Sequence, residues 1–215
     1  MSLKIKSFEF NAFQENTFVV SDTERNAIVI DPGCYSREEE QELAAYIKHE
    51  ELNIVALLNT HAHIDHVLGN AFIKEKYGVA YYLHQADITT LNAVQQYASL
   101  YGFEGYRLSP EPDFLMEDQS ELVFGSMCIK VLHTPGHCPG HVVFYFESEG
   151  IVINGDVLFN GSFGRTDLPG GNLETLKTSI FKTMFTMPES TLVYCGHGPS
   201  TTIKKERLSN YIHQF

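Results

Sequence analysis

Apolar and polar positions alternate with different periods along this chain, and each period predicts a different kind of element. Alternating or continuous short apolar runs are typical of strands, whereas apolar residues that recur every three or four positions are typical of helices. Strands are predicted over 3–10, 17–22, 27–33, 54–60, 80–84, 121–124, 128–133, 141–146, 151–154 and 191–195. Helices are predicted over 36–50, 70–78, 86–101, 173–186 and 200–213.

The segments 36–50 and 54–60 show the two patterns most clearly. An apolar stripe that includes Leu43 and Ile47 runs along 36–50, and acidic residues lie early in this segment, where the helix dipole favours them. Residues 54–60 form the continuous run IVALLNT, which is typical of a strand buried on both faces.

Two segments lack a helical or strand period. Residues 103–119 contain Pro110, Pro112 and several acidic residues, which predicts a loop, and their place in the chain suggests part of a substrate wall. Residues 161–172, GSFGRTDLPGGN, are rich in glycine and predict an ordered surface loop.

The order of the predicted elements indicates the fold class. Strands and helices are mixed in both halves of the chain, which predicts an α/β fold of two sheets packed face to face with helices outside. At 215 residues the chain is long enough for a substantial core. We expect one domain over residues 1–215.

Composition narrows the classes of partner. The formal net charge is −12, which disfavours binding to a phosphate backbone, so we expect no nucleic-acid partner. The chain contains no apolar run long enough to span a membrane, so we expect no membrane partner. The N-terminus alternates Leu3 and Ile5 with lysines, which favours a strand over a signal peptide and predicts a cytoplasmic protein.

The four cysteines predict no disulfide framework. They form no CxxC pair, and we expect them to be reduced and mostly structural. Their positions are Cys34, Cys128, Cys138 and Cys195.

Residues 59–70, NTHAHIDHVLGN, contain the strongest chemical signal in the sequence. His61, His63, Asp65 and His66 lie within six positions. Three neighbouring imidazoles repel one another once protonated, so a bound cation explains the cluster better than surface polarity does. Imidazole nitrogen and carboxylate oxygen suit zinc, iron or manganese.

Three further candidates follow other predicted strands. His137 lies in HTPGHCPGH, Asp156 in NGDVLF and His197 in CGHG, each beyond a strand end and in a turn rich in glycine or proline. Side chains at such strand ends tend to face a ligand crevice. Seven candidate ligands are too many for one tetrahedral ion and fit two ions that share a carboxylate and a hydroxide.

Other polar and aromatic residues have simpler interpretations. We expect His49, His84 and His213 to be structural or exposed, and Asp31 in IDPG to form a turn. Tyr101, Phe103 and Tyr106 are expected to pack in the core or on the surface.

The ordered set THAHIDH, TPGHCPGH, NGD and CGHG resembles the metallo-β-lactamase superfamily over nearly the whole chain. The resemblance implies a four-layer αββα sandwich with the metals at the edge between two mixed sheets. It implies that one metal is bound by His61, His63 and His137. It implies that the other is bound by Asp65, His66 and His197, with Asp156 bridging the two. His133 and His141 flank the third motif, and we expect them to support ligands or the fold.

The segment GDVLFNGSFGRTDLPGGN, together with CGH at 195–197, is most similar to the short, single-domain members of the glyoxalase II group. This resemblance implies hydrolysis of a small thioester such as S-lactoylglutathione by a metal-bridging hydroxide. Asp65 and Asp156 would be the catalytic carboxylates, as ligands that also shuttle a proton. Zinc is the first candidate for the two divalent ions, with iron or manganese as alternatives. The sequence does not predict an oligomeric state.

The chain departs from the glyoxalase II pattern in two ways. It ends at Phe215 without the C-terminal helical region that helps full-length members to bind glutathione. At the two positions that contact glutathione in those enzymes, it has Arg165 and then Asp167 in place of a tyrosine. Arg165 is therefore a candidate for substrate binding or for a simple ion pair with Asp167, and the thioester prediction is stronger than the glutathione prediction.

Alternative functions remain open. GRTD also resembles the persulfide dioxygenase branch, in which His61, His137 and Asp156 would hold a single iron for oxygen chemistry. The complete second set of ligands favours the hydrolase. β-Lactamases are usually exported, nuclease members usually carry a second domain, and a non-catalytic metal-binding module would be expected to have lost a ligand.

Overall fold

The computed structural model describes residues 3–215, and in this part of the chain the strands form two six-stranded sheets. The first sheet has the order β1-β2-β3-β4-β5-β6 and the second has the order β12-β11-β10-β9-β8-β7. The first comprises β1 (Lys4–Phe10), β2 (Glu15–Ser21), β3 (Asn26–Ile30), β4 (Asn53–Leu58), β5 (Ala80–His84) and β6 (Phe114–Met116). The second comprises β7 (Glu121–Phe124), β8 (Met127–His133), β9 (Val142–Phe146), β10 (Ile151–Ile153), β11 (Leu192–Tyr194) and β12 (Thr201–Thr202).

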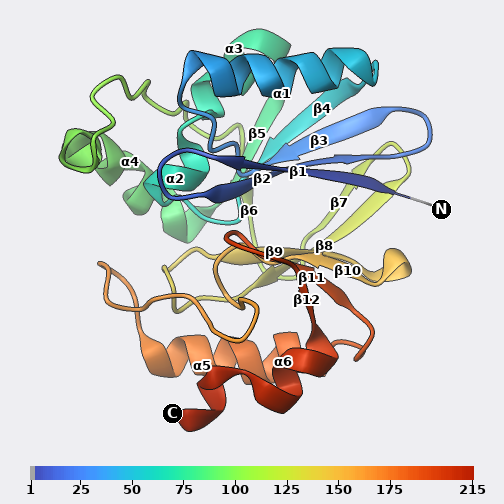
Figure 1. Cartoon of the computed structure of the whole chain (residues 1–215), viewed down its shortest axis with the longest axis vertical. Coiled ribbons are helices and arrows are strands. Elements are labelled where there is room, and N and C mark those ends of the chain that lie inside the picture. Colours follow the sequence, from blue (N-terminus) through green and yellow to red (C-terminus); the bar gives the residue numbers. More distant parts are fainter. Residues whose placement is uncertain (1–2) are drawn as a thin grey trace.

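Helices cover the outer faces of both sheets (Figure 1). The first sheet carries α1 (Arg37–His49), α2 (Ile64–Val67), α3 (Asn70–Tyr77) and α4 (Ile88–Tyr97), and the second carries α5 (Leu173–Lys182) and α6 (Ile203–Ser209). Short 3-10 turns are η1 (Gln85–Asp87), η2 (Ala98–Tyr101), η3 (Glu147–Glu149), η4 (Met184–Thr186) and η5 (Tyr211–Gln214). The arrangement confirms the predicted α/β fold of two mixed sheets with helices outside.

Three apolar layers separate the four layers of secondary structure. Along β3, Val29 faces the layer beneath the first set of helices, and Ile28 and Ile30 face the layer between the sheets. Along β9, Phe144 belongs to the layer between the sheets and Val143 to the layer beneath α5 and α6. Successive strand residues point to opposite faces, so a strand buried on both sides needs a continuous apolar run.

Local sequence explains where α1 begins. Ser36 accepts a hydrogen bond from the backbone N–H of Glu39, and the Glu39 carboxylate accepts one from the backbone N–H of Ser36. This reciprocal pair satisfies two backbone donors that a helix start otherwise leaves unpaired. One turn later, Leu43 and Ile47 place the apolar stripe against the sheet.

The structure corrects the prediction in several places. The helix predicted over 86–101 is divided into η1, α4 and η2. Residues 103–119 are not entirely loop, because Phe114–Met116 form β6, which pairs in parallel with β5. The helix predicted over 173–186 ends at Lys182 and is followed by η4. The helix predicted over 200–213 is interrupted, since β12 precedes α6 and Asn210 then caps η5.

Strand directions bring several strand ends to one edge of the sandwich. In the second sheet β8 and β10 both run antiparallel to β9, while β11 runs parallel to β10, so the carboxyl ends of β8, β10 and β11 lie at the same edge. In the first sheet β3 and β4 are parallel. A hydrogen bond from the backbone N–H of Val142 to the carbonyl of Thr60, 2.8 Å long, joins the two sheets at this edge.

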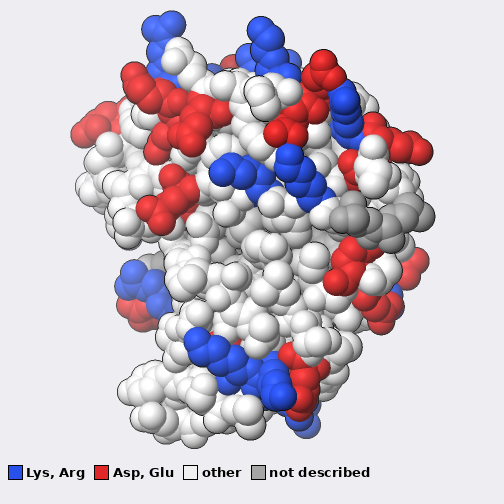
Figure 2. Space-filling view, turned by 45° about the vertical axis from the view of Figure 1, so that its right-hand side comes forward, with Lys and Arg blue, Asp and Glu red and all other residues white. Residues whose placement is uncertain are grey.

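Charged side chains are dispersed over the face shown in Figure 2. Lys and Arg side chains lie next to Asp and Glu side chains there, and a band across the middle of the face is largely uncharged. Among the helices of residues 3–215, none is both long and apolar enough to cross a membrane.

Candidate metal centre

The HxHxDH motif lies just beyond β4, where the chain turns into α2. His61 and His63 are in the connecting segment, and His63 is the residue that precedes the first turn of α2. Asp65 and His66 lie within that first turn. The imidazoles of His61 and His66 are fully buried, so they are placed to contact a group inside the protein rather than solvent.

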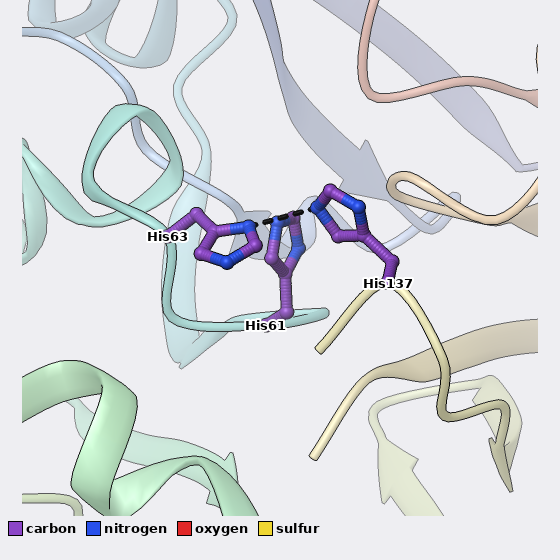
Figure 3. Close-up of side chains that lie close together, drawn as sticks. All are labelled: His61, His63 and His137. Atoms are coloured by element: carbon purple, nitrogen blue, oxygen red, sulfur yellow. Dashed lines mark hydrogen bonds between the residues drawn. The ribbon is translucent and has the colours of Figure 1, made fainter. Parts of the chain in front are cut away.

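One group of imidazoles joins this motif to the segment between β8 and β9. His61, His63 and His137 face one another in Figure 3, with His63 Nδ1 2.8 Å from His137 Nε2. One nitrogen from each of the three side chains lies within 4.8 Å of the others. His137 Nδ1 donates to the carbonyl of Arg165 at 2.8 Å, which leaves its Nε2 facing the group.

A second group is built from Asp65, His66 and His197, whose ligand atoms also lie within 4.8 Å of one another. His197 Nε2 is 3.1 Å from Asp65 Oδ2, and His66 Nε2 is 3.6 Å from the same oxygen. His197 Nδ1 donates to the carbonyl of Phe13 at 3.1 Å. The outer nitrogen of His197 is therefore occupied, and its inner nitrogen faces the group.

Asp156 lies between the two groups. Its Oδ2 is 3.5 Å from His137 Nε2 and 3.5 Å from His197 Nε2, while its Oδ1 is 3.6 Å from His66 Nε2. The structure thus brings all seven predicted ligand residues to one place, and Asp156 contacts members of both groups.

Several atoms in this centre are buried without a hydrogen-bond partner. His61 Nε2, His66 Nε2 and Asp156 Oδ1 all have this property, although buried polar atoms are rarely left unpaired. All three belong to the candidate ligands, and imidazole nitrogen and carboxylate oxygen are the donors that zinc and iron accept. These unpaired donors fit the presence of metal ions.

Comparison with known proteins identifies the family. The sequence model of the metallo-beta-lactamase superfamily matches residues 10–197. The chain belongs to the metallo-beta-lactamase superfamily. The resemblance of the four motifs is confirmed, and so is the αββα architecture that it implies.

Two curated relatives of the superfamily span nearly the same length. The Bacillus subtilis protein named "Probable metallo-hydrolase YqgX" is 42% identical over 197 residues, covering 90% of this chain and 89% of that protein. The Haemophilus influenzae "Hydroxyacylglutathione hydrolase GloC" is 32% identical over 209 residues, covering 97% of each. This chain is thus a member of a superfamily of metal-dependent hydrolases.

Two solved structures are also similar throughout. The crystal structure of BLEG-1, described as a B3 metallo-beta-lactamase, has a TM-score of 0.88 and 34% identity, and the match covers 97% of this chain and 98% of that chain. The crystal structure of TTHA1623 in a di-iron-bound form has a TM-score of 0.85 and 36% identity, with coverage of 96% and 98%.

Burial keeps three imidazoles of this metallo-beta-lactamase centre neutral. It lowers the pKa of His63 to about 4, with a further contribution from His137, and it lowers the pKa of His137 to about 4. Burial, followed by repulsion from His66, places the pKa of His61 well below its usual value. Neutral imidazole is the form that binds a metal, so these three donors are available at neutral pH.

The second group behaves differently because it contains a carboxylate. Burial alone lowers the pKa of His66 and His197, but the nearby Asp65 and Asp156 outweigh it and raise both. Burial likewise raises the pKa of Asp65, and attraction to His66 and His197 outweighs it and lowers that pKa below the usual range. The carboxylates thus favour a positive charge at this position, and a metal cation supplies one.

Asp31 supports two of the candidate ligands from outside. It is fully buried at the end of β3, with a backbone φ of 49°. Its Oδ2 is 3.2 Å from His66 Nδ1 and accepts a 2.5 Å hydrogen bond from the Thr60 hydroxyl, whose oxygen is 3.0 Å from His61 Nδ1. Asp31 lies at a bend that follows β3, and it also contacts His66, a role that its sequence context does not indicate.

Asp87 is a supporting residue that the sequence analysis does not single out. It is fully buried immediately before α4, where Oδ2 accepts from the backbone N–H of Ala62 at 2.6 Å and contacts Cys138 Sγ at 3.3 Å. Its Oδ1 accepts from the backbone N–H of Gly140 at 3.0 Å. Asp87 therefore joins the segment with His61 and His63 to the segment with His137.

Two glycines permit the close packing of Asp156. Gly155 has a φ of 50°, in the left-handed region where glycine is favoured, and a Cβ there would lie 2.5 Å from Thr60 Oγ1. A Cβ on Gly196 would lie 2.2 Å from Asp156 Oδ1. The glycines of NGD and CGH are thus required for the carboxylate to reach its position.

The remaining histidines do not join the two groups. His141 is fully buried behind His61, and its Nε2 accepts from the backbone N–H of Asp156 at 3.0 Å. His133 stacks on His84, with ring centroids 4.2 Å apart, and contacts the carbonyl of Pro139. His49 is exposed, and His213 stacks on Phe185.

A cavity of about 980 Å³ opens onto the metal centre. Arg165 contributes to its lining and forms a two-fold contact with Asp167, at 2.7 and 2.8 Å. The lining includes Tyr101 but no residue of 103–119 among those described. The suggestion that 103–119 forms part of a substrate wall does not hold for this cavity. Tyr101 is 50% exposed and so lies on the surface, as expected, and there it also lines the cavity. Residues 86–101 form this wall instead.

Proposed function

We propose that this protein is a binuclear metal-dependent hydrolase that cleaves small thioesters. The observation that carries the proposal is the position of Asp156, whose two oxygens lie 3.5–3.6 Å from His66, His137 and His197. Two complete ligand groups with a carboxylate between them favour two metal ions over one. The similarity to GloC supports hydrolysis of an acylated thiol.

In this proposal all seven residues that the structure brings together hold the metals. One ion would be held by His61, His63 and His137 and the other by Asp65, His66 and His197, and Asp156 would serve both groups. Zinc is the first candidate, and the di-iron form of TTHA1623 keeps iron open. When bound, the two ions supply a water molecule of lowered pKa and polarise the carbonyl of the substrate.

The side chains provide the proton pathway. Asp65 is slightly exposed, and both Asp65 and Asp156 line the cavity, so each is within reach of substrate and solvent. The attacking water forms the new C–O bond and the C–S bond breaks. The proton removed from water passes through one of these carboxylates to the leaving sulfur, and the products are a carboxylic acid and a free thiol.

Substrate binding is assigned to the cavity beside this centre. Arg165 lines that cavity, and we propose that it contacts the substrate near the mouth. The guanidinium of Arg165 donates hydrogen bonds to both carboxylate oxygens of Asp167, which offset its positive charge. This charge is therefore only partly available to an anionic substrate.

A second candidate function is hydrolysis of a β-lactam amide. The similarity to BLEG-1, a protein described as a B3 metallo-beta-lactamase, favours this candidate. The persulfide dioxygenase predicted as an alternative would use His61, His137 and Asp156 with a single iron and would leave Asp65, His66 and His197 without a role. The complete second group favours hydrolysis.

One experiment separates these candidates. Purified protein is analysed for metal content and then tested with S-lactoylglutathione, an uncharged acyl thioester, a β-lactam and glutathione persulfide. We expect about two metals per chain and release of free thiol. One iron per chain, with oxygen uptake on the persulfide and no thiol release, would refute the hydrolase. Preferential β-lactam cleavage would select the second candidate.

A further inference from the structure

The cavity beside the metal centre has two walls from separate parts of the chain. One wall is formed by α4 and η2, and the other by residues 159–170. In Figure 1, α4 lies on the side of the first sheet, and the segment that leads into α5 lies on the side of the second. His63, Asp65, His137, Asp156 and His197 lie at its inner end. A volume of about 980 Å³ accommodates a ligand of drug size, and a molecule in this cavity meets the metal ligands directly.

The α4–η2 wall has no charged residue from Ile88 to Tyr101. Leu91, Val94 and Ala98 on one face pack in the core. Of the other residues, some line the cavity, and they are Thr89, Thr90, Ala93, Tyr97, Leu100 and Tyr101. The polar but uncharged Asn92, Gln95, Gln96 and Ser99 are exposed outside it. A helix that faces solvent usually presents charged side chains on its outer face, so this uncharged outer face is suited to contact with an apolar ligand.

Aromatic and aliphatic side chains complete the enclosure. The 159–170 wall contributes Phe159, Phe163 and Leu168. Phe13, from the turn between β1 and β2, packs edge-on against Tyr101 with ring centroids 5.8 Å apart. Leu100 is 83% exposed although it lies beside the cavity, so a ligand can cover an apolar side chain that is now in water.

The walls of the cavity offer little positive charge to an anionic arm. Of the residues that line the cavity, Arg165 is the only lysine or arginine, and it is bound by both oxygens of Asp167. Asp65 and Asp156 also line the cavity, but they are assigned to the metal ions, which would offset their negative charge. Glutathione carries two carboxylates and one ammonium group at neutral pH, and the lining offers no unpaired lysine or arginine to receive the carboxylates.

We propose that the preferred substrate is an uncharged thioester whose apolar arm lies between α4–η2 and residues 159–170. This inference rests on the hydrolase proposal, in which water adds to the acyl carbon, the C–S bond breaks, and acid and thiol are released. It names the class of substrate that this cavity accepts.

Binding can be measured without turnover. Thioethers of N-acetylcysteamine with ethyl, butyl, hexyl and octyl chains are uncharged and cannot be hydrolysed, and calorimetry gives their affinities for the purified protein. We expect the affinity to rise about three- to fourfold per added CH2 group, the factor for moving one methylene out of water. S-hexylglutathione should bind more weakly than the uncharged hexyl thioether. Affinities independent of chain length, or tighter binding of S-hexylglutathione, would overturn the inference.

A pair of variants locates the binding site. Leu100→Gln places a polar group on the α4–η2 wall and should reduce the gain per CH2 group to about twofold or less. Leu208→Gln makes the same change at a residue of α6 that is 76% exposed and does not line the cavity. It should leave the gain in thioether affinity per CH2 group unchanged. Equal effects of the two substitutions would contradict a site between α4–η2 and residues 159–170.

Turnover distinguishes this inference from the function on which it rests. Metal-loaded protein is assayed for thiol release from hexanoyl-N-acetylcysteamine and from S-lactoylglutathione. A higher kcat/KM for the hexanoyl thioester supports both proposals. A higher kcat/KM for S-lactoylglutathione keeps the hydrolase and refutes the apolar arm. Chain-length-dependent thioether binding without any thioester cleavage refutes the hydrolase and retains the apolar binding site.

Discussion

Asp156 differs from the other six candidate ligands because its carboxylate contacts both groups, with Oδ2 3.5 Å from His137 and from His197 and Oδ1 3.6 Å from His66. Loss of its side chain should therefore weaken both metal positions. We predict that Asp156→Ala lowers turnover at least about 100-fold and reduces metal content below one per chain. Metal analysis and thiol release measure the two effects. As a control, Glu104→Ala removes an exposed carboxylate that does not line the cavity, and it should change neither metal content nor turnover. Near-normal turnover of Asp156→Ala would contradict the assignment.

Asp167 allows the charge of Arg165 to be tested directly. Asp167→Asn removes the compensating charge, so kcat/KM for S-lactoylglutathione should rise about 1.5- to fivefold, the range for an exposed ion pair. The value for an uncharged thioester should not change. Glu174→Gln removes a carboxylate that pairs with Lys177 outside the cavity, and it should have no effect on either substrate. An equal gain on both substrates would show that charge is not the cause.

His84 gives a prediction about pH. Burial, aided by His133, lowers the pKa of His84 to about 4, below the 6.5 of an unfolded histidine. Between pH 4 and pH 6.5, His84 is protonated in the unfolded chain but neutral in the folded protein. Its contribution to the free energy of unfolding is therefore fully present above pH 6.5 and is lost as the pH falls towards 4. The unfolding free energy of the metal-free protein should fall between pH 7 and pH 5. In His84→Gln, this fall should be smaller by about 1 to 2 kcal/mol. Urea titrations at the two pH values measure it, and an unchanged difference would contradict the assignment.

The metal-binding role of a residue could be predicted from the sequence where several motifs contain the same kinds of metal ligand. Imidazoles and carboxylates after successive strands indicated the metal centre, and the structure brings those residues together. Asp31 and Asp87 are single acids in otherwise ordinary segments, so nothing in their sequence context indicates their hydrogen bonds to Thr60 and Ala62. Their role depends on distant backbone groups, which only the folded chain brings near.

Among the elements, α4 connects the two halves of the metal centre through the residue that precedes it. Asp87 accepts hydrogen bonds from the segments on either side, and we predict that Asp87→Ala lowers metal affinity about 10- to 100-fold. Asp87→Asn keeps one acceptor oxygen and should restore part of that affinity. Metal-binding titrations measure the change.

Asp22 provides the matched control for Asp87. It accepts backbone hydrogen bonds from Asn26 and Ser126 and so also joins separate segments, but it follows the opposite end of β2 from the metal centre. Asp22→Ala and Asp87→Ala should each cost about 1 to 3 kcal/mol of unfolding free energy. Only Asp87→Ala should weaken metal binding. A comparable loss of affinity in Asp22→Ala would show a general effect of stability.

Elements with a strong period were predicted well, and short ones were missed. The helix over 36–50 and the strand over 54–60 have apolar patterns long enough to identify them. β6 has three residues and β12 has two, and both are edge strands whose formation depends on pairing with β5 and β11. The helical pattern over 86–101 predicted a helix, but its contact with the cavity follows from the position of α4 and η2 beside residues 159–170.

At the scale of the whole molecule, the metal centre joins the two sheets. His61, His63, Asp65 and His66 follow β4 of the first sheet, while the other candidate ligands follow strands of the second. Metal ions that bind only the folded chain stabilise it by mass action, and a concentration 1,000 times Kd contributes about 4 kcal/mol. We predict that chelation lowers Tm by about 10 °C, measured by calorimetry. An Asp156→Ala protein should show a clearly smaller shift, and an equal shift would contradict binding at this centre.

The overall architecture could be inferred from the pattern of apolar and polar positions, because each buried strand requires apolar residues on both faces. The order of strands within each sheet could not, since pairing partners are set by crossovers and by the packing of α1, α3 and α4 on the first sheet. The four-layer arrangement was specified further by the resemblance of the four motifs to a known family.

The burial of three cysteines has a consequence for redox behaviour if the protein releases a thiol, as proposed. Cys138 adjoins His137, Cys195 lies two positions before His197, and Cys34 is equally enclosed. Burial raises the pKa of Cys195 to about 12 and that of Cys138 well above its usual value, so neither forms the thiolate that attacks a disulfide. The exposed Cys128 does not line the cavity. Under the proposed reaction, the thiol product and its disulfide can accumulate beside the metal centre without forming mixed disulfides there.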